Sequence, residues 1–210
     1  TNATPPRAPA MPDWNQRFDS DDYFYGTEAN AFLRAQAGLL QAGQRVLAVA
    51  DGEGRNGVWL AEQGLAVTAV EFSANALKKA RKLAAERGVA PTFLEADLLR
   101  WHWPVAEFDV VAAIFIQFLG AAARERVFAA MQGALKPGGL LLLQGYTVDQ
   151  LNYRTGGPAV AEQLYTPALV RELLAGMEIV HLREHVGDLQ EGVGHRGPSA
   201  LLDVVARKPA

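Results

Sequence analysis

The chain has 210 residues, of which 50% are hydrophobic and 20% are charged, with a formal net charge of −3 and no cysteine. These values are typical of one globular domain, and the lack of cysteine excludes disulfides, thiolate metal sites and cysteine nucleophiles. The net charge favours neither nucleic acid nor an anionic membrane. No apolar run reaches the roughly 20 residues that a membrane span needs.

The first 13 residues are rich in proline, alanine and threonine, and they lack the apolar core of a secretory signal. We expect them to form a disordered tail before a single domain at residues 14–210. A cytoplasmic protein, monomeric or weakly dimeric, is the expectation. No histidine spacing in the chain indicates a metal site.

Apolar runs and helical patterns alternate along the rest of the chain. After an aromatic, acidic stretch at residues 14–26, helices are predicted at 29–40, 56–63, 74–87 and 121–135, and one more begins at Thr166-Pro167. Strands are predicted at 45–49, 66–71, 92–95, 108–115, 140–145, 179–185 and 200–207.

This alternation predicts an α/β fold with a single doubly wound, mostly parallel seven-stranded sheet and helices on both faces. Only a loop joins the last two strands, so they should pair antiparallel. The sheet therefore ends with one reversed, terminal antiparallel strand.

The most informative segment is residues 46–61, with the sequence VLAVADGEGRNGVWLA. An apolar run ends there in a glycine-rich turn, and a helical pattern follows, which brings bare backbone and a helix N-terminus beside a ligand. Glu71 closes the next apolar run 19 residues after Gly52, where a carboxylate accepts hydrogen bonds from ribose hydroxyls. We infer a cofactor that contains adenosine.

The charges in this turn indicate which cofactor it binds. Asp51 and Glu53 would both repel a pyrophosphate in a partly desolvated site. A ligand with a cationic end is favoured instead, and S-adenosylmethionine carries a sulfonium and an ammonium but no phosphate. We expect Asp51 to provide the charge that attracts it.

Small residues recur at every second position before Gly54, namely Ala48, Ala50 and Gly52. The pattern resembles the first motif of class I (Rossmann-like) S-adenosylmethionine-dependent methyltransferases, which is an acidic residue followed by three alternating glycines. Ala48 replaces the acid here, and Ala50 replaces the first glycine. The LKPGG segment at residues 135–139 resembles the one that often precedes the family's fifth strand.

Two further segments narrow this resemblance to one branch of the family. The Gly-Arg-Asn-Gly turn at residues 54–57 and the opening Trp14-x-x-Arg17-Phe18 are similar to the tellurite-resistance and thiopurine methyltransferase-like branch. The resemblance covers residues 14–207, which implies the family's fold over nearly the whole chain.

The resemblance also implies roles for residues of the cofactor site. Asp97 would accept a hydrogen bond from the adenine amino group, beside a backbone amide of Leu98, unless it only caps the following turn. Phe72 would pack on the adenine and Ile114 would line the methionyl side, although both could be core residues. Arg55 would pair with the methionine carboxylate, unless it is a surface arginine. The full set is Ala50, Asp51, Gly52, Arg55, Glu71, Phe72, Asp97, Leu98 and Ile114.

Three residues are candidates for the acceptor side of the site. The aromatic N-terminal stretch could fold over the cofactor as a lid, with Arg17 and Tyr25 facing the pocket, or pack on the sheet as an ordinary helix. His195 lies in a glycine-rich stretch between the last two strands. It is a candidate base or acceptor ligand, or simply a solvated loop histidine.

The predicted function is methyl transfer from S-adenosylmethionine to a small-molecule acceptor, because the predicted elements leave no separate substrate domain. A hard oxygen or nitrogen acceptor would need a proton acceptor such as His195 or Tyr25, whereas a soft nucleophile would not. Two alternatives stay open. One is an NAD(P)-dependent oxidoreductase, suggested by the literal Gly-x-Gly-x-x-Gly spacing at residues 52–57. The other is a non-catalytic S-adenosylmethionine-binding regulatory protein.

Overall fold

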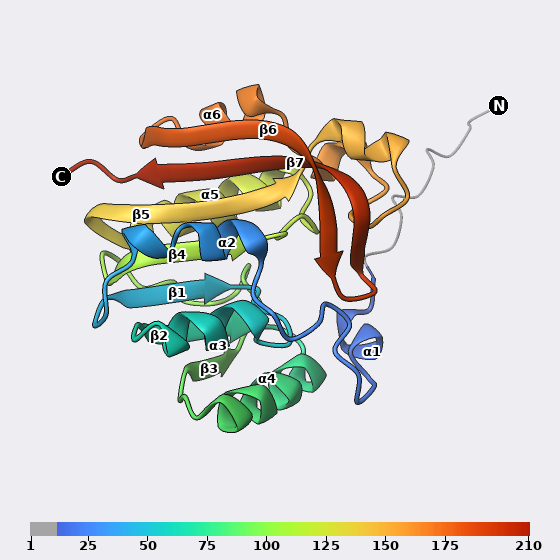
Figure 1. The fold of residues 1–210 in the computed structure, drawn as a ribbon. Helices are drawn as coiled ribbons and strands as arrows, with labels where there is room; N and C mark the ends of the chain where they lie inside the picture. Colours follow the sequence, from blue (N-terminus) through green and yellow to red (C-terminus); the bar gives the residue numbers. More distant parts are fainter. Residues whose placement is uncertain (1–11) are drawn as a thin grey trace.

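The computed structural model of the chain describes residues 12–210 (Figure 1). All but the last two residues of the predicted tail therefore lie outside the described part. None of the helices between residues 12 and 210 has the length and apolar character needed to cross a bilayer.

Seven strands form one sheet in the order β3-β2-β1-β4-β5-β7-β6. The strands β1 to β5 are parallel, and β7 is antiparallel to both β5 and β6. The predicted mostly parallel, seven-stranded sheet with a terminal antiparallel strand is confirmed. The strands are β1 Arg45–Val49, β2 Ala66–Glu71, β3 Thr92–Glu95, β4 Phe108–Ile114, β5 Leu135–Tyr146, β6 Glu178–Glu191 and β7 His195–Arg207.

Helices connect β1 to β2, β2 to β3 and β4 to β5, whereas a stretch without a helix joins β3 to β4. The α-helices are α1 Trp14–Arg17, α2 Ala31–Ala35, α3 Arg55–Glu62, α4 Ala74–Arg87, α5 Ala121–Ala134 and α6 Pro167–Leu173, and three 3-10 helices are η1 Ala37–Leu39, η2 Val148–Asn152 and η3 Ala161–Gln163. The Ser73 hydroxyl caps α4 by accepting from the amide of Ala76, and Gly88 ends that helix in a left-handed conformation.

The central strands divide their side chains between two hydrophobic clusters. Leu47 of β1 packs in one cluster with residues of α5 and α6, whereas Val46 packs in the other with residues of α2 and α3. Successive side chains of a strand point to opposite faces of a sheet. In Figure 1 the helices α2 and α3 lie in front of the sheet.

One predicted helix and one predicted strand differ from the observed elements. The helix expected at residues 29–40 is divided into α2, capped by the Asn30 side chain, and the short η1, which contains Gly38. Glycine disfavours a continuous helix by about 1 kcal/mol relative to alanine. The strand expected at residues 140–145 already begins at Leu135, which pairs with Phe108 before a register shift, so the LKPGG segment lies within β5.

The terminal hairpin is much longer than predicted. Pairing of β6 with β7 continues as far as Glu191 and His195, so the turn contains only residues 192–194. His195 is therefore the buried first residue of β7 and not a loop residue. The amide of Gly194 donates to the carbonyl of Phe24, which ties the tip of the hairpin to the N-terminal stretch.

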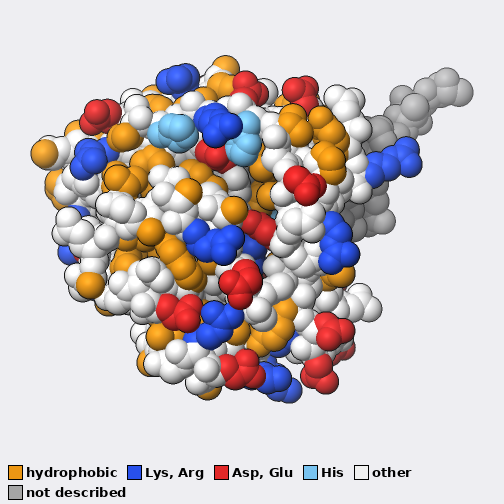
Figure 2. Space-filling view, viewed as in Figure 1, with side chains coloured by type: hydrophobic (Ala, Val, Ile, Leu, Met, Phe, Trp, Pro, Cys, Tyr) orange, Lys and Arg blue, Asp and Glu red, His pale blue; other side chains and the backbone are white. Residues whose placement is uncertain are grey.

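The strand β6 forms one edge of the sheet. Its exposed residues include His181, Arg183 and Glu184, and Figure 2 shows histidine and mixed charges gathered over this part of the surface. Charged side chains on an edge strand oppose further strand pairing.

Candidate functional site

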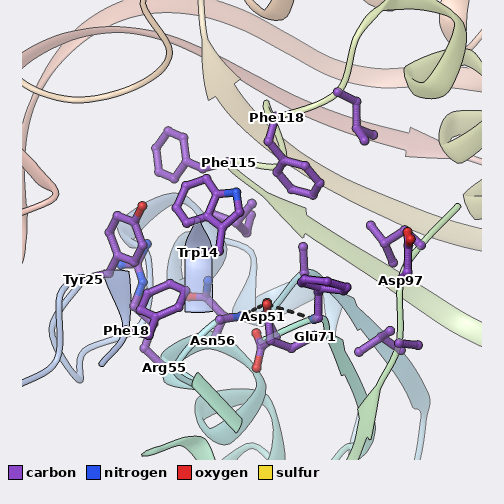
Figure 3. Close-up of a pocket in the computed structure, with 18 of the residues that line it drawn as sticks. Trp14, Phe18, Tyr25, Asp51, Arg55, Asn56, Glu71, Asp97, Phe115 and Phe118 are labelled. Carbon is purple, nitrogen blue, oxygen red and sulfur yellow. Dashed lines mark hydrogen bonds between the residues drawn. The ribbon is translucent and has the colours of Figure 1, made fainter. Parts of the chain in front are cut away.

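A cavity of about 240 Å³ lies at the carboxyl ends of β1, β2 and β4, beneath residues 14–26 (Figure 3). This is the edge of an open α/β sheet where ligands bind. We call residues 14–26 the N-terminal lid, because Trp14, Phe18 and Tyr25 all line the cavity. The lining also holds every residue of the predicted cofactor set.

The chain leaves β1 and β4 through two residues with unusual backbone angles. Ala50 has a φ of 49° and Phe115 a φ of 55°, both in the left-handed region that costs a non-glycine residue about 1 kcal/mol or more. Both residues line the cavity. Ala50 thus stands, at some strain, where the related motif has a glycine.

The glycine-rich turn offers bare backbone to the cavity. Gly52 has a φ of 57°, and a Cβ added there would approach only the Cζ of Phe18, at 3.9 Å, across open space. Gly54, with a φ of 91°, instead packs against Ala80 of α4 so closely that a side chain would clash. The two glycines therefore differ in role, since only Gly52 faces the ligand space.

Asp51 is held at the start of α3. Its two carboxylate oxygens lie 3.0 and 3.2 Å from the amide of Gly57, which donates to them. Burial raises the pKa of Asp51 to about 7, although the Gly57 hydrogen bond acts against the shift. Asp51 is thus poised to ionise fully when a cation binds beside it.

Glu71 connects the turns after β1 and β2. One oxygen accepts from the amide of Gly52 at 2.8 Å, and the other accepts from the amides of Phe72 and Ser73, both at 2.9 Å. Burial raises the pKa of Glu71, and these backbone hydrogen bonds oppose the shift. These three amides fix the carboxylate at the cavity wall.

The predicted adenine-binding residues lie together at the cavity wall. Asp97 accepts from the amide of Leu99 at 2.9 Å, so it does cap the following turn while it lines the cavity. Leu98 is buried beside it. The Phe72 side chain is 63% exposed, so the alternative of a core aromatic is wrong. Ile114 belongs to both the core and the cavity lining.

Arg55 is not a surface residue, and it is not free. Its guanidinium pairs with the Glu191 carboxylate at 2.9 Å, and both side chains are buried. The alternative of a surface arginine is therefore wrong. The expected pairing with a methionine carboxylate stays a prediction, and the existing ion pair with Glu191 makes it less favourable. Arg55 remains within reach of the cavity that it lines.

Glu53 does not contribute to the ligand site, contrary to the expectation for the turn. Its buried carboxylate forms an ion pair with Lys79 and accepts from the amides of Phe24 and Tyr25 at 3.1 and 3.2 Å. Lys79 in turn donates to the carbonyl of Asp22 at 2.8 Å. Glu53 and Lys79 thus fasten the N-terminal lid to the core.

The candidate residues of the acceptor side have different positions. Tyr25 and His195 line the cavity and face one another, with ring centroids 4.4 Å apart. The Arg17 guanidinium instead lies 4.8 Å from the Trp14 ring and 5.4 Å from the Phe24 ring, and it is absent from the cavity lining. The expectation that Arg17 faces the pocket is therefore not met.

Sequence reasoning missed several residues of this site. Asn30 is fully buried and donates to both Gln144 and Glu191, at 2.6 and 2.9 Å, and its amide donates to the side chain of Asn56 at 2.9 Å. Phe118 closes the upper wall of the cavity in Figure 3. No local pattern marks these residues, because their partners lie far away in the sequence.

The charges that line the cavity define its chemistry. Asp51, Glu71 and Asp97 face the cavity. Among residues 12–210, the Lys or Arg side chain that lines it is Arg55, whose charge is neutralised by Glu191. Such a set of acceptor carboxylates suits hydroxyl groups and a cationic ligand, and it offers no positive charge to a diphosphate. No group of three His, Cys, Asp or Glu side chains among residues 12–210 is arranged to hold a metal ion.

Part of the chain is similar in sequence to known methyltransferases. Residues 46–139 match the family described as a methyltransferase domain. The demethylmenaquinone methyltransferase of Thermus thermophilus is 35% identical over 107 residues, which are 50% of this chain and 48% of that protein. The chain therefore matches about half the length of this curated relative.

Solved structures share the fold at low sequence identity. TehB from Haemophilus influenzae has a TM-score of 0.70 and 17% identity, over 87% of this chain and 63% of that one. The [4+2]-cyclase SpnF has a TM-score of 0.68 and 18% identity, over 90% and 88% of the two chains. At this low sequence identity, the similarity of structure shows a shared fold and nothing about function.

Proposed function

We propose that this chain is a class I methyltransferase and that it transfers a methyl group from S-adenosylmethionine to a small-molecule acceptor. The charges that line the cavity support the choice of S-adenosylmethionine as the cofactor. Three carboxylates line the cavity, while the arginine of the lining is neutralised by Glu191. A ligand with a sulfonium and an ammonium suits this charge distribution, and a dinucleotide does not.

The cavity residues suit the parts of that cofactor in turn. Asp51 would face the ammonium, and Glu71 would accept hydrogen bonds from the ribose hydroxyls. The exposed ring of Phe72 would cover one face of the adenine, with Asp97 and the backbone of Leu98 at its edge. These assignments follow the family resemblance together with the placement of each side chain.

When bound, the cofactor supplies the electrophilic methyl group, and the protein's contribution is alignment and exclusion of water. The N-terminal lid supports such a role, because Trp14 and Phe18 form part of the cavity lining. The cavity volume of about 240 Å³ suits small molecules. The relative from Thermus thermophilus is named a demethylmenaquinone methyltransferase.

The structure supports the two alternative functions to different degrees. An NAD(P)-dependent oxidoreductase needs a site for a diphosphate, and the three carboxylates of this cavity disfavour it. A non-catalytic binding protein draws support from Ala48 and Ala50, which depart from the family motif. The [4+2]-cyclase among the similar folds shows that this architecture also hosts other functions.

Calorimetric titration of the full chain with S-adenosylhomocysteine and, separately, with NADH tests the proposal. We expect saturable heat with the first ligand and none with the second. The reverse result would overturn the choice of cofactor. Binding without methyl transfer to any acceptor in a broad panel would favour the non-catalytic alternative.

A further inference from the structure

One end of the cavity has aromatic walls. The Trp14 ring lies 6.0 Å from that of Phe18, with an interplanar angle of 25°, and 6.3 Å from that of Phe118, nearly edge-on. Figure 3 shows these rings and Phe115 gathered on one side of the cavity, away from Asp97. Two of the rings come from the N-terminal lid and two from the segment after β4. Flat apolar walls of this kind suit a planar aromatic ligand.

His195 adjoins this aromatic end. Its ring lies between Tyr25 and Phe115, with centroid distances of 4.4 and 4.3 Å, and it lines the cavity. The Nδ1 atom is buried 3.7 Å from a carboxylate oxygen of Glu191 and has no hydrogen-bond partner among the described residues. Such contacts are often long before a ligand binds and tighten afterwards.

Other residues hold the Glu191 carboxylate in place. Arg55 pairs at 2.9 Å with the oxygen that faces His195, and the side chain of Asn30 donates to the other oxygen at 2.9 Å. The amide of Ala31 donates to the same second oxygen at 3.2 Å. A carboxylate held in this way can orient a histidine whose Nδ1 proton points toward it.

Four titratable or charged groups face His195, each from a different element. They are Glu191 of β6, Arg55 of α3, Tyr25 of the N-terminal lid and Tyr146 of β5. Burial lowers the pKa of His195, and Arg55 lowers it further, whereas Glu191 raises it. The imidazole is therefore neutral at neutral pH, with Nε2 free to accept a proton.

We infer that the acceptor is an aromatic molecule with a hydroxyl group, that its ring occupies the space between the aromatic walls, and that His195 takes the hydroxyl proton while Glu191 positions the imidazole. This inference rests on the proposed function and specifies the acceptor of the same site. His195 is the catalytic residue, and Glu191 is a positioning residue.

The step balances without any further reactant. Nε2 of His195 takes the proton of the hydroxyl group, and the acceptor oxygen forms a bond to the methyl carbon. The carbon–sulfur bond breaks, and its electron pair returns to sulfur, which leaves a neutral thioether and a methyl ether. The imidazolium, paired with Glu191, then releases its proton to solvent.

The test uses phenol, thiophenol and aniline, which share one ring and differ in the nucleophilic atom. Transfer is measured as release of S-adenosylhomocysteine by the full chain. We expect methylation of phenol, and His195→Gln should slow it by about 100-fold or more, as loss of a general base does. With 4-nitrophenol, which is largely ionised at assay pH, the same variant should lose less than about 10-fold.

Two measurements do not depend on turnover. Phenol should quench tryptophan fluorescence in the wild-type chain, and Trp14→Phe should remove most of that quenching. The heat of S-adenosylhomocysteine binding should be unchanged in His195→Gln. The matched control is His181→Gln, an exposed histidine of the same hairpin, which should behave as the wild type in every assay.

Glu191→Gln tests the positioning role, with Glu191→Asp as a second variant in case the first does not fold. Loss of the carboxylate should move the rising limb of the phenol pH profile to lower pH, because Glu191 favours the imidazolium. A lower rate with an unmoved profile would indicate a merely structural role and would overturn the assignment.

Other outcomes overturn the rest of the inference. If His195→Gln lowered the rates with phenol and 4-nitrophenol equally, His195 would not be the base. Transfer to thiophenol or aniline but not to phenol would refute the acceptor class. Both results leave the proposed function intact, since the cofactor still binds, whereas a wild-type chain that binds no S-adenosylhomocysteine overturns both proposals.

Discussion

The Arg55 guanidinium and the Glu191 carboxylate lie 2.9 Å apart in the protein interior, and they join the start of α3 to the end of β6. The pair thereby connects the glycine-rich turn before α3 to the hairpin that carries His195. Removing one member of a buried ion pair leaves the other without compensation, which is strongly destabilising.

Glu191→Gln should therefore change the acid stability of the chain. Burial alone would raise the pKa of Glu191, but His195 and Arg55 outweigh it and lower the pKa to about 2. Because the folded-state pKa lies below the unfolded one, the stabilisation is present above about pH 4.5 and is lost as the pH falls toward 2. The shift corresponds to about 3 kcal/mol. Urea unfolding should show the variant less stable at pH 6 and nearly equal to the wild type near pH 2.

The control for this experiment is Glu184→Gln, which removes an exposed carboxylate from the same strand. Its unfolding curve should follow the wild type at both pH values. A Glu191→Gln deficit that stayed constant between pH 6 and pH 2 would contradict the assigned ion pair.

Asp51→Asn should increase stability while it weakens cofactor binding. With a folded-state pKa of about 7, Asp51 holds its proton more tightly in the folded chain, so it destabilises the fold as the pH rises from about 4 to about 7. At pH 8 the neutral variant should be more stable by up to about 4 kcal/mol, and at pH 4 the two should be equal. Its affinity for S-adenosylhomocysteine should fall about 10-fold, a loss of about 1.4 kcal/mol.

Thermal unfolding at both pH values and calorimetry at pH 8 measure these two effects. Asp149→Asn, at an exposed aspartate, serves as the control. If the affinity of Asp51→Asn matched the wild type, the carboxylate would not contact the ammonium.

Gly57→Ala should disturb the cofactor site through Asp51. A Cβ at residue 57 would collide with the carboxylate of Asp51, whereas one at Gly133 in α5 would meet nothing within 4 Å. Both glycines lie in helices, so Gly133→Ala should gain about 0.5 to 1 kcal/mol of stability. Gly57→Ala should lose stability and bind S-adenosylhomocysteine more weakly. Equal gains in both variants, measured by urea unfolding, would contradict the close contact.

Ala50→Gly should be tolerated far better than Ala48→Gly. Ala50 has a φ of 49°, so glycine relieves the strain there, and this offsets the roughly 0.4 to 1 kcal/mol of added unfolded-state entropy. Ala48 lies buried in β1 and gains nothing from glycine. The free energies of unfolding should therefore differ by about 1 kcal/mol in favour of Ala50→Gly. The opposite ranking would argue against backbone strain at residue 50.

Glu53→Gln should loosen the N-terminal lid without unfolding the core. An amide has one acceptor oxygen in place of two, so it cannot serve both the Phe24 and Tyr25 amides as well as Lys79. Hydrogen exchange at residues 23–26 should accelerate about 10-fold, whereas α5 should be unaffected. Glu125→Gln, on the exposed side of α5, is the control. Unchanged exchange in the lid would show that other contacts hold it.

The features that were predictable from sequence are those with a local cause. Residues 46–57 carry an apolar run, glycines and a helix start within one short segment, and both β1 and α3 follow from them. The Glu71 carboxylate was located by its distance from the turn. The parallel sheet follows from the alternation of strands and helices.

The remaining features depend on contacts between distant segments. Glu53 was expected in the ligand site by its neighbours in the turn, yet its partners are Lys79 and the lid amides. His195 was expected in a loop because glycines surround it, yet those glycines allow the long hairpin to pack closely on the lid. Side-chain direction after a turn depends on tertiary packing, which single-residue patterns do not encode.

The attachment of the N-terminal lid has an evolutionary consequence. Glu53 accepts hydrogen bonds from the main-chain amides of residues 24 and 25. Every residue type except proline provides such an amide, so this attachment does not depend on the aromatic side chains that shape the cavity. Trp14 and Phe18 can therefore be exchanged while the closing contact persists. A lineage descended from this protein could acquire new acceptors by varying those two positions, with the cofactor machinery left untouched.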